Sequence, residues 1–396
     1  MKKRGRFILL VIDGLGVGAQ EDAGDYGDEN ADTLGHVCRE TQCVLPNFQR
    51  LGLGNITELS SVQPADNPLA SWGMMREVSP GKDSTTGHWE LAGIHLERPF
   101  PLYPEGFPDE LIDSFCRGVG CDKVLCNLPY SGTQVINDYG EEHLDTGFPI
   151  VYTSADSVFQ VACHVDVAPV ETLYNWCKFA REEVFTGRHG VGRVIARPFE
   201  GRPGGFERIS EKRHDYSITP PVPNLISLLN HHEIKVWSIG KVVDLFAEKG
   251  FAQYRRTRSN AEGISQLLSL LSSGVEGLIF VNLIDTDQLY GHRQDPEGYA
   301  RSLQEIDRAL PAIFERLGKE DLLIITSDHG NDPADDSTDH TREYVPLLAS
   351  GRGASPSRNL GLRETFSDVA ASALHFFRLD ENLPGDSFLE IRENNR

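Results

Sequence analysis

Basic residues are scarce in this chain of 396 amino acids. Only 38 Lys and Arg face 59 Asp and Glu, so that the net charge is −21. Nucleic acids and anionic membranes bind basic protein surfaces, which release the counterions of the polyanion. We therefore expect neither a nucleic acid nor a membrane as a partner. At roughly 100 to 200 residues per domain, the length predicts two domains.

Long hydrophobic runs are also lacking. The apolar stretch from Phe7 to Ile12 follows four basic residues and ends after six residues at Asp13. A signal peptide needs an apolar run of roughly 7 to 15 residues, and no segment approaches the roughly 20 residues of a transmembrane helix. These absences predict a soluble, cytoplasmic protein.

Cysteine is infrequent and shows no paired spacing. The seven cysteines form no C-x-x-C motif and lie at Cys38, Cys43, Cys116, Cys121, Cys126, Cys163 and Cys177. An odd number without such spacing favours reduced thiols over a disulfide framework. This agrees with a cytoplasmic location.

Three apolar runs end in acidic residues. They are Phe7–Ile12 before Asp13, Leu278–Ile284 before Asp285 and Asp287, and Leu322–Thr326 before Asp328. Continuous runs of this kind are typical of strands that are buried on both faces of a parallel sheet. We expect further strands at residues 191–196 and 234–239.

A helix is expected where apolar residues recur at alternating spacings of four and three. They are Tyr299, Leu303, Ile306, Leu310, Ile313 and Leu317. Gly318 closes the pattern, and Pro311 should bend the helix. The alternation of strands and helices predicts an α/β core whose mainly parallel sheet is covered by helices.

Two proline-rich stretches, 98–108 and 219–223, bracket the middle of the chain. The segment between them carries strand-like runs of its own and a helix-like stretch around 171–183. We predict a smaller α/β cap domain at 99–217, inserted into a core formed by 1–98 and 218–396 and hinged at the prolines. The alternative is that residues 99–217 form a long segment of a single domain.

Acidic strand ends and histidines together predict a metal site. Ligands of open α/β sheets bind beyond the carboxyl ends of the strands, and carboxylates gathered there repel one another unless cations lie between them. The candidate ligands are Asp13, Asp287, His292, Asp328, His329 and His340. Asp and His without thiolates suit two ions of the Mn, Zn or Mg kind, which indicates phosphoryl or related ester chemistry. Taken singly, each Asp is also explained as a cap or turn residue and each His as a surface residue.

The segment 81–90 supplies a group that such metals would activate. It reads Gly-Lys-Asp-Ser-Thr-Thr-Gly-His-Trp-Glu and offers three consecutive hydroxyls, Ser84, Thr85 and Thr86. A hydroxyl held on a divalent cation loses its proton more easily and can attack phosphorus. A helix-capping run is the alternative. The glycine-rich stretch 14–18 lacks G-x-G-x-x-G spacing and does not support nucleotide binding.

The same residues lie in motifs of a known family. The chain resembles the phosphopentomutases of the alkaline phosphatase superfamily over nearly its whole length. The matching motifs lie at Val11–Gly14, Asp32–His36, Gly81–Glu90, Tyr152–Ser157, Gly192–Phe199, Arg213–Tyr216, Asp287–His292, Thr326–Pro333 and Thr338–Tyr344. The related cofactor-independent phosphoglycerate mutases share the metal plan but lack the middle motifs.

The resemblance implies an alkaline-phosphatase-like core, an inserted cap and an isomerase activity. Family members interconvert α-D-ribose 1-phosphate, or the 2-deoxy sugar, with the 5-phosphate in nucleoside breakdown. They do so through a phosphorylated enzyme and a 1,5-bisphosphate, with two Mn²⁺ ions and sugar bisphosphate activators that prime the enzyme. A closing cap would exclude water and hold the sugar.

The resemblance also implies roles for single residues. One metal would take Asp13, Asp328, His329 and the oxygen of the nucleophile, and the other would take Asp287, His292 and His340, with Asp285 outside the pattern. The residues implied in binding pentose phosphates are Ser154, Asp156, Arg193 and Arg208 on the cap and Lys241 on the core.

Position 84 departs from the family pattern. The family nucleophile is a Thr directly after Gly-Lys-Asp, and this chain has Ser84 there, with Thr85 as the fallback. The hydroxyl is retained, so we expect the chemistry to survive, while the smaller side chain favours access of water to the phosphoenzyme. A metal-dependent sugar-phosphate phosphatase and a catalytically silent metal and sugar-phosphate binder are the alternatives. The sequence does not indicate an oligomeric state.

Overall fold

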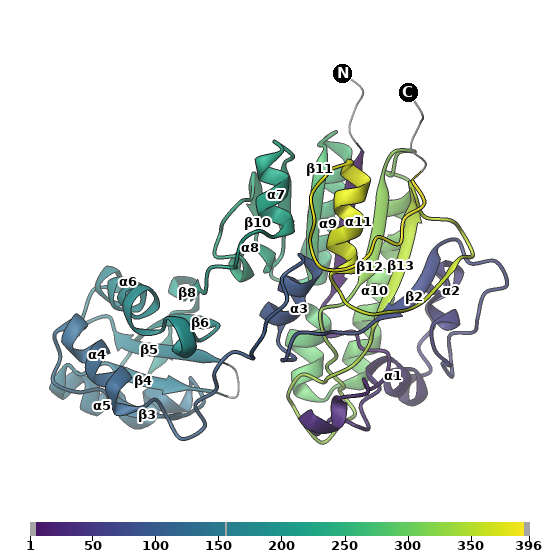
Figure 1. Ribbon diagram of the computed structural model, residues 1–396. Helices are drawn as coiled ribbons and strands as arrows, with labels where there is room; N and C mark the ends of the chain where they lie inside the picture. The colour runs from purple at the N-terminus through teal and green to yellow at the C-terminus, as the bar shows by residue number, and fades with distance from the viewer. Residues whose placement is uncertain (1–4, 155–156, 392–396) are drawn as a thin grey trace. The chain divides into compact units, whose positions relative to one another are not determined.

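The computed structural model describes residues 5–154 and 157–391, and it divides into two compact units (Figure 1). The core unit consists of Met1–Arg98 and Pro220–Arg396, and the inserted unit consists of Pro99–Thr219. The sequence analysis predicted these boundaries between residues 98 and 99 and between residues 217 and 218.

The core unit contains a mixed sheet of eight strands within the described residues, in the order β10-β9-β11-β1-β12-β13-β2-β14. The strands are β1 (Arg6–Ile12), β2 (Ser71–Met75), β9 (Val236–Ile239), β10 (Gln253–Arg255), β11 (Gly277–Leu283), β12 (Leu322–Thr326), β13 (Val345–Gly351) and β14 (Asn359–Arg363). Neighbours from β10 to β12 are parallel, whereas β13 is antiparallel to both β12 and β2. The predicted mainly parallel sheet is confirmed.

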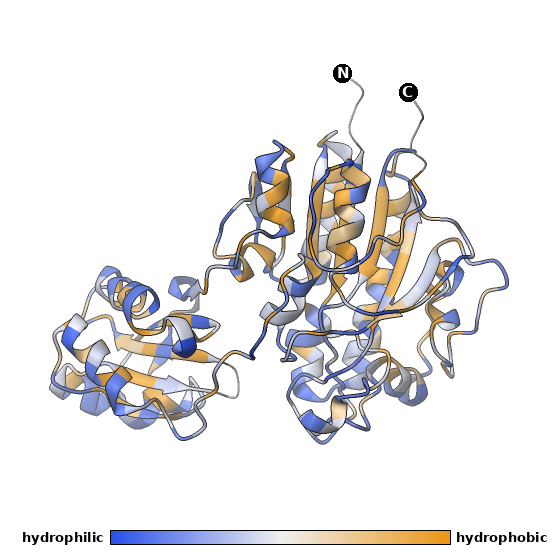
Figure 2. Ribbon diagram, in the orientation of Figure 1, coloured by the Kyte–Doolittle hydropathy of each residue, from blue (hydrophilic) through white to orange (hydrophobic). Residues whose placement is uncertain are grey.

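Helices cover both faces of this sheet. They are α1 (Thr33–Thr41), α2 (Pro46–Leu51), α3 (Ser84–Leu91), α7 (Leu225–His231), α8 (Val242–Leu245), α9 (Asn260–Ser272), α10 (Pro296–Phe314) and α11 (Asp368–Phe377). Ile8 and Leu10 of β1 share a core with α1, α9 and α10, while Phe7 points to the other face and meets Phe376 of α11. Burial on both faces explains why β1 is apolar at every position except Arg6, and much of the central part of this sheet is coloured as apolar in Figure 2.

Short helical turns connect these elements. Those of the 3₁₀ type in the core unit are Ala23–Tyr26, Leu53–Asn55 and Gly291–Arg293, and Thr286–Tyr290 is a π-helical turn. The π-helical turn begins at Thr286, shortly after β11 ends at Leu283, and carries Asp287. Such turns are frequent at functional sites.

The inserted unit is a smaller α/β structure. Within its described residues the sheet has the order β3-β4-β5-β6-β7, with β8 paired to β6. Its elements are α4 (Asp109–Val119), β3 (Leu125–Pro129), α5 (Gln134–Thr146), β4 (Ile150–Thr153), β5 (Val158–His164), α6 (Val170–Phe179), a π-helical turn (Ala180–Val184), a 3₁₀ turn (Gly187–His189), β6 (Arg193–Glu200), β7 (Glu207–Arg208), a 3₁₀ turn (Ser210–Lys212) and β8 (His214–Ser217). Helices α4 and α6 pack on one face of this sheet and α5 packs on the other.

The predicted elements are found with shifted ends. The run 191–196 becomes β6, which begins at Arg193 and extends to Glu200. Helix α10 ends at Phe314, before the predicted limit at Gly318, and contains Pro311. Among the described residues, no helix combines the length and the apolar character that spanning a bilayer requires.

Helix α3 lies against the end of β12 because residue 87 is glycine. A Cβ atom at Gly87 would lie 1.9 Å from the backbone oxygen of Asp328. We expect Gly87→Ala to lower the free energy of unfolding by about 1 to 3 kcal/mol, as overpacking does, even though alanine favours helix. Urea unfolding measures this change.

Gly24→Ala is the matched control, because an added Cβ meets no atom within 4 Å there. Its free energy of unfolding should stay within about 0.5 kcal/mol of the parent value. Equal stability of the two variants would contradict the close approach of α3 to β12.

Candidate metal centre and nucleophile

The ends of three parallel strands meet at one edge of the core sheet. Ile12 pairs with Leu283 of β11, and Val11 pairs with Thr326 of β12, so the residues that follow all three strands lie level with one another. Hydrogen bonds join these ends: the Ser327 hydroxyl donates to the Ile12 carbonyl (2.7 Å), and the Thr286 hydroxyl donates to the Asp13 carbonyl (2.6 Å). Asp13, Asp287 and Asp328 therefore gather at this edge.

Asp13, Asp328 and His329 form a first group of possible ligands. The three residues are buried, and their ligand atoms all lie within 4.8 Å of one another. Nε2 of His329 is 3.4 Å from Oδ1 of Asp13 and 3.3 Å from Oδ2 of Asp328. Burial lowers the pKa of His329, but Asp328 and the other carboxylates outweigh it and raise this pKa to about 10. The raised pKa reports an excess of negative charge that a cation would balance.

Asp287, His292 and His340 form a second group. Oδ1 of Asp287 lies 3.2 Å from Nε2 of His340 and 3.5 Å from Nε2 of His292, and the two imidazole nitrogens are 3.1 Å apart. Although burial raises the pKa of Asp287, His340 and further cations hold it well below its ordinary value. All six predicted ligands are thus brought together in two neighbouring groups.

Asp285 forms hydrogen bonds with Asn260 and does not lie among the possible ligands. Its Oδ2 accepts a hydrogen bond from the backbone N–H of Asn260 (2.8 Å), and Oδ1 of Asn260 accepts one from the N–H of Asp285 (3.0 Å). This reciprocal pair fixes the start of α9 to the end of β11. The structure keeps Asp285 outside both groups of possible ligands.

Ser84 is the first residue of α3 and faces the first group. Its Oγ lies 3.1 Å from Nε2 of His329, and the Lys241 ammonium donates a hydrogen bond to it (2.7 Å). Asp83 caps the helix by accepting from the backbone N–H groups of Thr85 (2.9 Å) and Thr86 (3.2 Å). The cap is thus made by Asp83, the residue before the three hydroxyls. The Ser84 hydroxyl does not cap the helix and instead contacts Lys241 and His329.

Lys241 lies between the hydroxyl and a carboxylate. Its Nζ is 2.6 Å from Oδ2 of Asp13, besides its bond to Ser84. Burial lowers the pKa of Lys241, but the carboxylates of Asp13, Asp287 and Asp328 outweigh it and raise this pKa above its ordinary value. The side chain therefore stays cationic beside the Ser84 oxygen.

The donor set fits a pair of divalent metal ions. Both side-chain oxygens of Asp13 and Oδ2 of Asp328 are buried and accept no well-aligned hydrogen bond, although cationic groups lie near them. Buried carboxylate oxygens of this kind are costly unless a cation satisfies them. Three carboxylates and three imidazoles without thiolates match the ligand preferences of Mn²⁺, Zn²⁺ and related ions.

Three further residues organise the site and were missed as site residues by the sequence analysis. His88, one turn after Ser84 in α3, has Nδ1 2.9 Å from the Ser84 carbonyl and 3.0 Å from Oδ2 of Asp328. The position of His88, four residues after Ser84 on the same helix, is the sequence signal that could have identified it. The buried Arg342 donates to the carbonyls of Ser79 (2.8 Å) and Gly81 (2.7 Å) and so ties the segment before Ser84 to that after His340.

Glu343 is the third of these residues and joins three loops. Its buried carboxylate accepts hydrogen bonds from the backbone N–H groups of Gly18 and Thr33 (both 3.0 Å) and from the Thr341 hydroxyl (2.6 Å). Gly16 and Gly330 leave room for it, because a Cβ on either would come within 2.4 Å of the carboxylate. The glycine-rich stretch after β1 therefore packs against a carboxylate of the chain itself.

The residues implied in substrate binding on the inserted unit are placed as follows. Ser154 follows β4, Arg193 begins β6 and Arg208 lies on the exposed β7. Nη1 of Arg193 is 3.6 Å from Oδ2 of Asp215. Asp156 lies outside the described residues.

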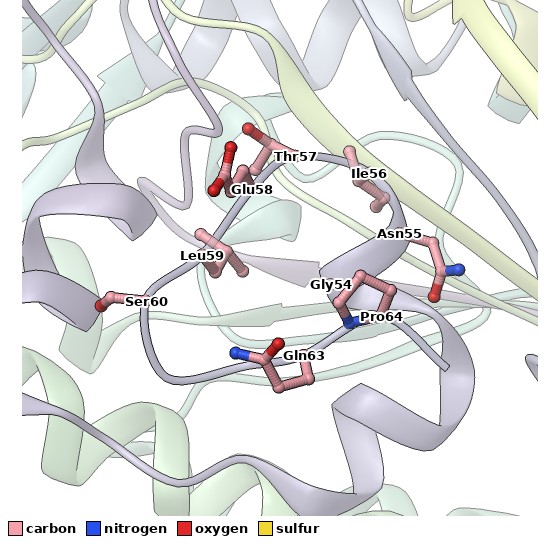
Figure 3. A pocket seen from close by; sticks show the side chains of 9 residues that line it. All are labelled: Gly54, Asn55, Ile56, Thr57, Glu58, Leu59, Ser60, Gln63 and Pro64. Carbon is pink, nitrogen blue, oxygen red and sulfur yellow. The ribbon is translucent and has the colours of Figure 1, made fainter. Parts of the chain in front are cut away.

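A hollow of about 680 Å³ lies elsewhere on the core unit (Figure 3). All nine residues that line it come from the single segment 54–64, and Glu58 is the only ionisable residue among them. None of the candidate ligands or hydroxyls lines it. The chemistry described above is therefore not located in this hollow.

Comparison with known proteins relates the chain to characterised families. The model of the metalloenzyme superfamily matches residues 5–381. The phosphopentomutase of Caldanaerobacter subterraneus subsp. tengcongensis is 50% identical over 384 residues, which cover 97% of each chain, and that of Deinococcus radiodurans is 51% identical over 384 residues, covering 96% of this chain and 98% of the relative. The solved PH0037 protein from Pyrococcus horikoshii shares the fold, with a TM-score of 0.50 at 16% identity over 97% of this chain and 100% of that one.

Fold, donor set and family model together define the class: the chain is a member of the metalloenzyme superfamily and binds divalent metal. Within that superfamily it belongs to the phosphopentomutase family, as identities near 50% over almost the whole chain show. It is accordingly an enzyme, an isomerase of the mutase type. The family resemblance found in the sequence is confirmed.

Glu343 should make stability depend on pH near neutrality. Burial raises its pKa to about 7, although the hydrogen bonds that it accepts oppose the shift. Since the unfolded state loses this proton at a lower pH, the stabilisation is complete in acid and is lost as pH rises through the folded-state value. From pH 6 to pH 8 the free energy of unfolding should fall by about 1.4 kcal/mol through this residue.

Urea unfolding of the parent and of Glu343→Gln at both pH values measures the effect. The parent should lose more stability than the variant between pH 6 and pH 8. A loss of the same size in both proteins would show that Glu343 does not titrate in this interval.

Proposed function

We propose that this enzyme interconverts α-D-ribose 1-phosphate, or 2-deoxyribose 1-phosphate, with the 5-phosphate through a phosphoserine at residue 84. The observation that carries the proposal is the position of the Ser84 hydroxyl, 2.7 Å from the Lys241 ammonium and 3.1 Å from His329 at the edge of the carboxylate cluster. Relatives named phosphopentomutase over nearly the whole chain support the choice of substrate.

The proposed cycle consists of two transfers. The free 5-hydroxyl of the 1-phosphate attacks the phosphorus on Ser84: a new O–P bond forms, the bond to Oγ breaks, and the hydroxyl proton passes to Oγ. The product is the 1,5-bisphosphate. After this intermediate turns, Oγ attacks the 1-phosphoryl group, its proton passes to the departing sugar oxygen, and the 5-phosphate leaves. Atoms and charge balance over the cycle without any oxidant or reductant.

Residues of the core unit support these transfers. Asp13, Asp328 and His329 would hold one divalent ion, and Asp287, His292 and His340 a second, with Mn²⁺ as the proposed metal. Such ions supply charge neutralisation at the phosphoryl oxygens and lower the pKa of a bound hydroxyl. The Lys241 ammonium donates a hydrogen bond to Oγ and stabilises the negative charge that develops there when the O–P bond breaks.

The inserted unit supplies the proposed sugar-phosphate contacts. Arg193 and Arg208 offer guanidinium groups that match a phosphate in charge and shape, and Ser154 offers a hydroxyl. The assignment of Asp156 to the sugar hydroxyls stays a prediction. In a chain of net charge −21, cationic side chains are needed to attract a sugar phosphate.

The two candidate nucleophiles are separated by phosphoryl labelling. Incubation with ³²P-labelled ribose 1,5-bisphosphate and Mn²⁺ should label the parent enzyme and Thr85→Ala, but not Ser84→Ala, because of the two candidates it is the Ser84 hydroxyl that contacts Lys241 and His329. Acid-stable radioactivity on the chain is the measurement. Retention of the label in Ser84→Ala together with its loss in Thr85→Ala would transfer the role to Thr85.

The products separate a mutase from a phosphatase. With Mn²⁺, a bisphosphate primer and ribose 1-phosphate, the enzyme should yield ribose 5-phosphate with little inorganic phosphate, and a chelator should abolish the reaction. A coupled assay for ribose 5-phosphate and a colorimetric assay for phosphate follow both. Dominance of free ribose and phosphate would indicate a phosphatase instead, and Ser84→Thr, which restores the family residue, is the matched control.

A further inference from the structure

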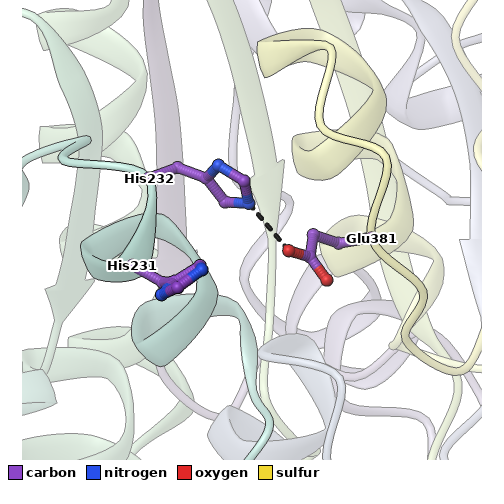
Figure 4. Close-up of side chains that lie close together, drawn as sticks. All are labelled: His231, His232 and Glu381. Atoms are coloured by element: carbon purple, nitrogen blue, oxygen red, sulfur yellow. Dashed lines mark hydrogen bonds and ion pairs between the residues drawn. The ribbon is translucent and has the colours of Figure 1, made fainter.

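A separate cluster of side chains of the types that bind metals, two histidines and a glutamate, lies on the core unit (Figure 4). It consists of His231, the last residue of α7, His232, which caps that helix, and Glu381 from the segment after α11. None of these residues contributes to the proposed reaction. Two segments that are far apart in the sequence thus bring these side chains to one place.

The geometry of the cluster suits a single ion. One ligand atom from each residue lies within 4.8 Å of the other two. Nε2 of His232 is 2.7 Å from Oε1 of Glu381, and the two imidazole rings have centroids 5.2 Å apart at 83°. Two nitrogen ligands of a tetrahedral ion at about 2.0 to 2.1 Å are roughly 3.3 Å apart, so the His232–Glu381 pair needs to widen by only a fraction of an ångström.

The surroundings also favour a cation. The helix C-terminus carries partial negative charge, and both histidines stand there. The side chains of His232 and Glu381 are 34% and 30% exposed, so an ion can enter and a water molecule can complete its coordination. An ion pair between His232 and Glu381 alone gives no role to His231, whose ring stands beside that of His232.

We propose that His231, His232 and Glu381 bind one Zn²⁺ ion that is separate from the catalytic metals. Two imidazoles and a carboxylate are a ligand set that Zn²⁺ prefers, with water in the fourth position. The ion would replace the hydrogen bond between His232 and Glu381. It joins α7, which packs against α11, to the segment that follows α11, and so stabilises the core unit.

The test counts Zn²⁺ ions on the full-length, Mn²⁺-loaded enzyme. Zn²⁺ is titrated at pH 7.5 against a chromophoric chelator of micromolar affinity, for the parent, His231→Ala and Glu381→Gln. We expect the parent to retain one more Zn²⁺ per chain than either variant. Replacement of Mn²⁺ by Zn²⁺ at the catalytic centre should be equal in all three proteins and does not affect this difference. Glu233→Gln, which neutralises an exposed neighbouring carboxylate, is the control and should retain as many ions as the parent.

Thermal unfolding gives an independent readout. At a hundredfold excess of Zn²⁺ over its Kd, the melting temperature of the parent should rise by roughly 3 °C more than that of either variant. Equal retention of Zn²⁺ by the parent and both variants overturns the proposal. Loss in Glu381→Gln without loss in His231→Ala also overturns it, because the site requires all three ligands.

Discussion

The core unit depends on one electrostatic constraint: three carboxylates are buried together at the ends of parallel strands. Asp13 and Asp328 are fully buried and Asp287 is 5% exposed. Taking such charges out of water is costly unless cations compensate them. In the described structure the Lys241 ammonium and nearby imidazoles supply part of that compensation. The arrangement of the remaining carboxylate oxygens is suited to divalent ions. The apolar strands that precede these residues hold the carboxylates at this edge of the sheet.

The same constraint explains how the proposed nucleophile, Ser84, is positioned. The Ser84 hydroxyl faces Lys241 and His329 because α3 begins at this residue and lies against the end of β12. Gly87 permits that approach, and His88 links the Ser84 carbonyl to Asp328. Arg342 and Glu343 then join the loops around the cluster through buried hydrogen bonds. The geometry of the candidate site is thus produced by buried polar contacts as much as by the sheet.

Much of this arrangement was predictable from local sequence. Apolar runs that end in Asp predicted β1, β11 and β12, and parallel register alone brings the acids to one edge. Local pattern could not decide between Asp285 and Asp287, which both follow β11. The choice is made by the π-helical turn and by the reciprocal hydrogen bonds of Asp285 with Asn260.

Long-range contacts account for what the sequence did not reveal. His340 reaches the cluster through the bridge between Gly330 and Thr341, a pairing that no periodicity encodes. Most buried partners of Arg342 and Glu343 lie far away along the chain, so the two residues look like ordinary surface charges in the sequence. Family motifs pointed to the segment that contains them, but only the fold shows which loops they join.

Anomalous diffraction at the manganese absorption edge, from crystals of the enzyme grown with Mn²⁺, tests the central claim most directly. The account predicts two manganese peaks beyond the ends of β1, β11 and β12. One peak is bounded by Asp13, Asp328 and His329, with the Ser84 oxygen beside it, and the other is bounded by Asp287, His292 and His340. Crystals with Mn²⁺ bound only elsewhere, and none between these carboxylates, would contradict it.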